Sequence, residues 1–167
     1  MYKKILVALG NEKPDAPLLE HAGKLARMTN GELLLLHVAD GWAARNYDHL
    51  QLAESEEIRA DKAYLQNKAG ELRAAGLQAG WHLAMGNPPQ EIMRVARERA
   101  CDLIMLATHG HKAVGDVIFG STIDKVRHNT TIPLLIVYGG KPGIRPAAQA
   151  IPPHGATQTD ATSQRRV

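Results

Sequence analysis

The stretch "DLIMLATHGHKAVGDVIFGST" (residues 102–122) joins a continuous apolar run to the start of a helical pattern through a loop that contains glycines. "DLIMLA" (102–107) does not alternate between polar and apolar residues, which is typical of a strand covered on both faces of a parallel sheet. The helical pattern follows Thr122 directly. The stretch therefore predicts a strand–loop–helix unit, the building block of an α/β fold.

Strands and helices are predicted to alternate along the chain. Apolar runs predict strands at 4–9, 32–38, 102–107 and 133–138, and a weaker, mixed run at 77–85 suits an edge strand. Helical periodicity predicts helices at 14–29, 50–75, 88–100 and 119–129. In the second of these helices we expect Ile58, Leu65 and Leu72 to form a buried stripe and "ESEEIRADK" (54–62) to lie largely in solvent. The order indicates a parallel sheet with right-handed crossovers.

The composition is that of one domain with an aliphatic core. Of 167 residues, 44% are hydrophobic and only 4% are aromatic, so Leu, Ile, Val and Ala must fill the interior. The single cysteine, Cys101, excludes an intramolecular disulfide and favours a reducing compartment. No signal peptide and no run long enough to span a membrane is visible, so we expect a cytoplasmic protein without membrane contact.

The net charge of +3 lies entirely in the last part of the chain. Residues 140–167 carry four basic residues and one acidic residue, whereas residues 1–139 are balanced. A domain with no net charge and few aromatic residues lacks the basic surface that nucleic-acid binding requires. We predict a domain over residues 1–139 and a flexible, basic tail rich in Pro, Gly and Thr over residues 140–167.

The loop after residue 107 has the features of a phosphate-binding loop. Gly120, Ser121 and Thr122 open the following helix, whose free N–H groups and positive dipole end favour anions. Gly110 lets the backbone approach a ligand closely. Named phosphate motifs fit poorly, because "GHKAVGD" has Asp116 where a Walker A loop needs Lys, and no G-x-G-x-x-G occurs.

The spacing Gly110-x9-Gly120-Ser121 resembles the universal stress protein family, whose nucleotide-binding members carry G-x2-G-x9-G-[ST] after the fourth strand. The likeness extends over residues 2–138, from "YKKILVAL" to "IPLLIVY". It implies an open five-stranded parallel sheet with helices on both faces, Rossmann-like or flavodoxin-like, in the strand order 3-2-1-4-5. It also implies a dimer that binds ATP or a related adenine nucleotide.

The resemblance implies which residues bind the nucleotide, and two of them depart from the family pattern. Ala107 replaces the first glycine of the motif, and Gly10 stands where an Asp reads the adenine, whereas Val38 at the end of the second strand is retained. We expect binding to survive with weaker affinity or a relaxed adenine preference. The predicted nucleotide-binding residues are Ala8, Leu9, Gly10, Val38, Ala107, His109, Gly110, His111, Lys112, Gly120, Ser121 and Thr122.

No catalytic residues and no protein metal site are predicted. His109 and His111 flank Gly110 but have no partner ligands at metal-binding spacing. Asp116 and Asp124 would hold Mg²⁺ only through phosphate oxygens, and Asp124 equally suits the first turn of its helix. His37, inside "LLLLHVA", is interpreted as a satisfied core or cleft residue, and Arg94, Arg97 and Arg99 as a solvated helix face.

Three hypotheses of function follow. The first is a regulatory module that binds ATP and changes its contacts with an unknown protein partner in stress response. The second is a weak ATP-hydrolysing enzyme, which would need a positioned base and charge-neutralising groups. The third is a dimeric interaction protein that has lost its nucleotide. A homodimer is expected through residues 132–138, because this final apolar strand should lie at the sheet edge without cover.

Overall fold

Five parallel strands form a sheet in the order β3-β2-β1-β4-β5. The computed structural model describes residues 1–11, 15–40, 56–108 and 121–139. The strands are β1 (Lys4–Leu9), β2 (Glu32–Ala39), β3 (Ala79–Met85), β4 (Leu103–Thr108) and β5 (Leu134–Tyr138). The helices are α1 (Asp15–Thr29), α4 (Glu56–Ala74), α5 (Pro88–Glu98) and α6 (Ser121–Asn129). The predicted fold class and strand order are confirmed.

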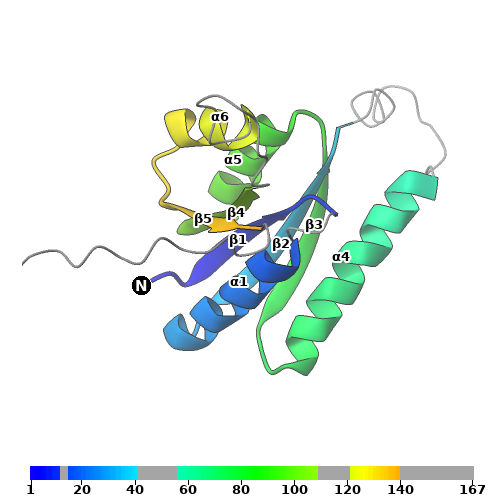
Figure 1. Cartoon of the computed structure of the whole chain (residues 1–167), viewed down its shortest axis with the longest axis vertical. Coiled ribbons are helices and arrows are strands. Elements are labelled where there is room, and N and C mark those ends of the chain that lie inside the picture. Colours follow the sequence, from blue (N-terminus) through cyan, green and yellow to red (C-terminus); the bar gives the residue numbers. More distant parts are fainter. Residues whose placement is uncertain (12–14, 41–55, 109–120, 140–167) are drawn as a thin grey trace, which may run out of the picture.

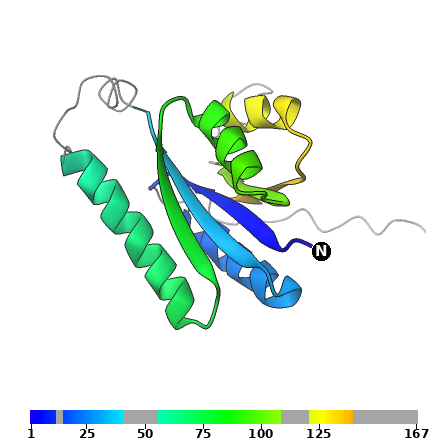
Figure 2. The same cartoon turned by 180° about the vertical axis from the view of Figure 1, so that it is seen from behind.

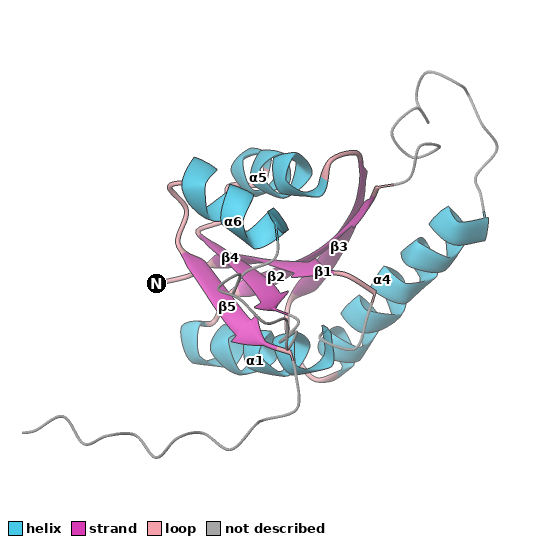
Figure 3. Ribbon diagram, turned by 45° about the horizontal axis from the view of Figure 1, so that its top comes forward, coloured by secondary structure: helices cyan, strands magenta, loops and turns pink. Residues whose placement is uncertain are grey.

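The helices cover the two faces of the sheet in pairs. In Figure 1 and, more clearly, in Figure 3, α1 and α4 lie on one side of the sheet and α5 and α6 on the other. Figure 2 shows the same layers from behind. Each face has its own aliphatic cluster: alternate residues of β1, such as Ile5 and Val7, pack with α1 and α4, whereas Leu6 packs with α5 and α6. Burial on both faces explains the continuous apolar runs.

The strand and helix ends agree with the prediction to within two residues in the described part, except at the start of α4. That helix begins at Glu56, and residues 50–55 of the predicted helix lie outside the described residues. The predicted edge strand 77–85 is confirmed, since β3 is at one edge and β5 is at the other. The predicted tail, residues 140–167, also lies outside the described residues.

The described residues of the segment expected to lie largely in solvent are mostly exposed, but Asp61 is an exception. It falls in that segment, yet it is only 7% exposed. It lies on the same helix stripe as Ile58 and Leu65, which are buried against the sheet. A buried carboxylate needs hydrogen-bonding partners, and those of Asp61 lie at the carboxyl end of the sheet.

The amino end of the sheet is closed by short polar contacts. The Asp102 carboxylate accepts hydrogen bonds from the backbone N–H groups of Lys3 (2.7 Å) and Lys4 (3.0 Å). Although burial opposes ionisation, these hydrogen bonds lower the pKa of Asp102 below its ordinary value. Close by, Gly31 is buried, and a Cβ atom on it would lie 2.6 Å from the backbone oxygen of Tyr2. No helix in the described part of the chain is long and apolar enough to cross a membrane.

The contact at Gly31 gives a stability prediction with a matched control. Gly31→Ala should lower the free energy of unfolding by about 1–3 kcal/mol, because the new methyl group collides with backbone that cannot easily shift. Gly70→Ala, inside α4 with no heavy atom within 4 Å of the added Cβ, should instead raise it by about 0.5–1 kcal/mol. Urea unfolding measures both, and equal stabilities for the two variants would contradict the packing at Gly31.

Candidate functional site

The topological switch point of the sheet lies between the carboxyl ends of β1 and β4. The helices that follow these two neighbouring strands lie on opposite faces of the sheet. The two strands are neighbours, and β1 is followed by α1 on one face, whereas α6, after β4, lies on the other (Figure 3). In open α/β sheets, ligands bind beyond the carboxyl ends of the strands at such a point. The sheet therefore places its candidate site at the ends of β1, β4 and β2.

β1 ends earlier than β4. The last residue pair between them is Ala8 with Leu106, while β4 continues through Ala107 and Thr108 in register with β5. The N–H of Gly10 donates to the Asp15 carboxylate (3.0 Å) and not to β4. Backbone groups alternate sides along a strand, and Thr108 accepts from Gly139 on the β5 side. The backbone of Ala107 therefore turns toward the space beyond β1.

β2 also outruns β1. The last β1–β2 pair is Leu9 with His37, whereas Val38 and Ala39 continue in register with β3. Ala39 accepts a hydrogen bond from Gly86 on the β3 side, so the backbone of Val38 turns to the β1 side. Backbone groups of β2 and β4 thus border the end of β1 from both sides.

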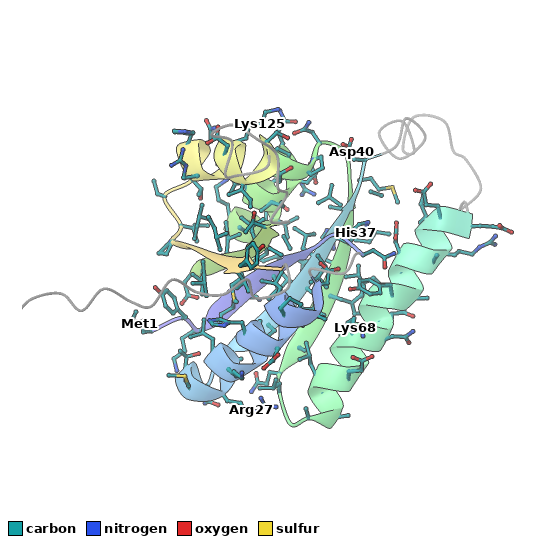
Figure 4. The ribbon with its side chains drawn as sticks, viewed as in Figure 1. Met1, Arg27, His37, Asp40, Lys68 and Lys125 are labelled. Carbon is teal, nitrogen blue, oxygen red and sulfur yellow. The ribbon has the colours of Figure 1, made fainter. Side chains whose placement is uncertain are left out.

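Side chains from three other elements hold residues 9–11, which we call the exit segment. Figure 4 shows His37 in the part of the sheet near α4, from which Asp61 and Tyr64 come. His37 Nδ1 lies 2.8 Å from the Leu9 oxygen, and its Nε2 lies 3.4 Å from Asp61 Oδ2. The Asn11 amide donates to Asp61 Oδ1 (3.1 Å). The interpretation of His37 as a satisfied residue is confirmed.

Asp15 is the second buried carboxylate of this end. It is 4% exposed and begins α1, where the helix dipole favours a negative charge. The Tyr64 hydroxyl donates to its Oδ2 at 2.7 Å, while Oδ1 accepts from Gly10. Burial, followed by this hydrogen bond to Asp15, raises the pKa of Tyr64 well above its ordinary value. Tyr64 therefore stays a hydrogen-bond donor at neutral pH.

The structure brings together part of the predicted nucleotide-binding set. Ala8 and Leu9 end β1 and Gly10 follows them, Val38 and Ala107 border that end, and Ser121 and Thr122 begin α6. The remaining predicted residues lie outside the described residues: His109, Gly110, His111, Lys112 and Gly120.

Of the two candidate Mg²⁺ ligands, one lies outside the described residues and the other lies within them. Asp116 lies outside the described residues, whereas Asp124 is in the first turn of α6, half exposed and 2.9 Å from the Arg127 guanidinium. That ion pair favours the helix-start interpretation of Asp124. The described residues contain no group of three or more His, Cys, Asp or Glu that could hold a metal. Arg94, Arg97 and Arg99 are exposed, as expected of a solvated helix face.

Sequence reasoning missed the polar residues that hold the exit segment: Asn11, Asp15, Asp61 and Tyr64. A signal was present for Asp61, which shares the helix stripe of Ile58 and Leu65. A charged residue among apolar ones on a buried stripe indicates a polar partner inside the fold.

Comparison with known proteins decides the family. The model of the universal stress protein family matches residues 1–138. The chain belongs to the universal stress protein family. Universal stress protein YxiE of Bacillus subtilis is 28% identical to it over 147 residues, which is 82% of this chain and 99% of the relative.

Solved members of the universal stress protein family share the fold. The structure of MJ0577 from Methanocaldococcus jannaschii matches with a TM-score of 0.67 at 24% identity, over 86% of this chain and 99% of that one. A universal stress protein in complex with cAMP matches with a TM-score of 0.64 at 18% identity, over 83% and 98%. A universal stress protein from Archaeoglobus fulgidus in complex with dAMP matches with a TM-score of 0.62 at 21% identity, over 81% of this chain and 97% of that one.

Proposed function

We propose that this universal stress protein is a regulatory module that binds ATP or a related adenine nucleotide at the carboxyl ends of β1, β2 and β4. The observation that carries the proposal is the early end of β1, which leaves the backbone of Val38 and Ala107 bordering one space. The start of α6 at Ser121 offers N–H groups and a positive dipole end for phosphates. The cAMP and dAMP complexes of structural neighbours support a nucleotide as the ligand.

The proposed ligand spans the site from α6 toward β2. Phosphates lie at the start of α6, and Mg²⁺ accompanies them through phosphate oxygens. His109, Gly110, His111, Lys112 and Gly120, which lie outside the described residues, are assigned to the phosphates by the family motif alone. The base lies near the ends of β1 and β2, beside Gly10 and Val38. We assign binding and no catalytic residue to this site. Nucleotide state then governs contacts with a protein partner in the cytoplasm.

A second candidate is a dimeric interaction protein without nucleotide. Two positions favour it: Gly10 has no side chain to pair with a base, and Ala107 adds a methyl group at the end of β4. The Ala107 side chain is partly buried against the cluster on the α1 and α4 face. Its methyl group is therefore partly taken up by the core, which favours nucleotide binding over this alternative.

Calorimetry with ATP tests the proposed site. Gly120→Val should weaken ATP binding by more than about 100-fold, because a branched side chain directly before α6 occupies the space where phosphates approach its first N–H groups. The matched control is Gly80→Val in the edge strand β3, where an added Cβ has no heavy atom within 4 Å. It should bind ATP as the unchanged protein does. Equal ATP affinity in a folded Gly120→Val protein would contradict the phosphate site.

We also propose that two copies pair through β5. This strand lies at the sheet edge with apolar side chains toward both faces, since Leu135 packs with one core cluster and Leu134 and Ile136 with the other. These side chains are only partly buried within one chain, and Tyr138 is 51% exposed. An apolar edge strand is an association surface, and pairing about a two-fold axis would satisfy its backbone.

Light scattering after size-exclusion chromatography tests the pairing. The unchanged protein should have twice the mass of one chain at micromolar concentration. Leu135→Lys or Ile136→Lys should give monomers or insoluble protein, because the charge enters the paired edge. Gly80→Lys places the same charge on the opposite edge, β3, and should leave the dimer intact. A monomeric unchanged protein would contradict the proposal.

A further inference from the structure

The exit segment presents an oriented amide directly after Gly10. Asn11 is exposed and has a φ of 58°, in the left-handed region that Asn tolerates better than most residues. Its Nδ2 lies 3.1 Å from Asp61 Oδ1. An ionised carboxylate only accepts hydrogen bonds, so the nitrogen of the amide, and not its oxygen, must face Asp61. The contact therefore fixes which way the amide is turned.

Asp61 is itself held in place. It is 7% exposed, and its second oxygen lies 3.4 Å from His37 Nε2. The other ring nitrogen of His37 lies 2.8 Å from the Leu9 oxygen, and because a carbonyl oxygen only accepts, this nitrogen carries a proton. The imidazole is thus oriented by β1, and it lies beside the carboxylate, whose movement is restricted by burial. The chain of contacts ends at the Asn11 amide.

The amide oxygen of Asn11 is left as an acceptor. Among the residues that the structure describes, none donates a hydrogen bond to it. Gly10, the residue before it, has its N–H occupied by Asp15 and carries no side chain. The Asn11 side chain is therefore the first side chain beyond β1 that can offer a hydrogen bond to a ligand.

Asn11 belongs to the base end of the proposed site. The phosphate end is at α6, which packs with α5 on the opposite face of the sheet from α4. Asn11 is bonded to α4, and α4 packs on β2 and β3. A nucleotide with its phosphates at α6 extends across the end of β1 toward β2, where Val38 turns its backbone to the β1 side.

We propose that the Asn11 amide oxygen accepts a hydrogen bond from the exocyclic amino group of a 6-aminopurine, and that Asp61 is the positioning residue for this contact. The inference rests on the proposed nucleotide site. Adenine carries an amino donor at C6, whereas hypoxanthine and guanine carry a carbonyl acceptor there. A fixed acceptor pairs with the donor and faces a second acceptor unfavourably, so it discriminates strongly between these bases.

Calorimetry with ATP and with inosine triphosphate tests the proposal, because the two ligands share their phosphates and ribose and differ at C6. The unchanged protein should bind ATP about tenfold or more tightly than inosine triphosphate, a difference of about 1.4 kcal/mol. Asn11→Gly removes the amide and tolerates the positive φ. This substitution should reduce the ratio of the two affinities, ATP over inosine triphosphate, to less than about threefold, mainly by weakening ATP binding.

The chain offers a closely matched control. Asn30 is also exposed, with a φ of 50°, but it follows α1 at the amino end of the sheet. Asn30→Gly is the same substitution in the same backbone conformation, and it should leave the ATP preference unchanged. Asp61→Asn tests the positioning role: an amide at residue 61 can donate as well as accept, so Asn11 is no longer held in one orientation, and the ratio should narrow as in Asn11→Gly.

The outcomes separate this inference from the proposed function. An ATP preference that persists in Asn11→Gly, or is absent from the unchanged protein, overturns the base contact while nucleotide binding stands. If Asp61→Asn prefers ATP over inosine triphosphate as strongly as the unchanged protein does, the positioning role of Asp61 is overturned. Failure of the unchanged protein to bind either nucleotide overturns the proposed function, and the inference with it.

Discussion

The hydrogen bond from the Gly10 N–H to the buried Asp15 carboxylate stands where β1 leaves the sheet, before β2 and β4 end. A continuing ladder would direct this N–H toward β4, but it donates to the first residue of α1 instead. The residues of β2 and β4 that run on, Val38 and Ala107, therefore turn backbone groups toward the space beyond β1. The candidate site depends on this local departure from regular pairing.

The same interaction ties the site to the rest of the fold. Asp15 also accepts from Tyr64 of α4, and Asp61 of that helix faces both Asn11 and His37. Two buried carboxylates thus join the exit segment to α1, α4 and β2. Buried polar groups of this kind are costly unless they are paired, so their pairing fixes one arrangement of the segment. A ligand that binds beside it meets groups that are already oriented, which reduces the entropy lost on binding.

The strands and the two sheet edges could be predicted from sequence because burial on both faces leaves a continuous apolar signature, seen at 4–9 and 102–107. The polar contacts could not be predicted in the same way. Asp61 stands in a highly charged segment, and only its place on the buried stripe of α4 distinguishes it from its neighbours. The role of Asn11 depends on a residue fifty positions away. Local patterns report local burial, whereas such pairs arise from tertiary packing.

The central claim is that a nucleotide binds where β1 ends before β2 and β4. Amide ¹H–¹⁵N spectra recorded during a titration with ATP test it most directly, because each backbone N–H reports on its own surroundings. The account predicts shifts for Gly10, Val38, Ala107 and Ser121, at the carboxyl ends of the strands and the start of α6. It predicts no shifts for Glu32 and Asp102 at the amino end. Shifts confined to the amino end, or a spectrum that ATP does not change, would contradict it.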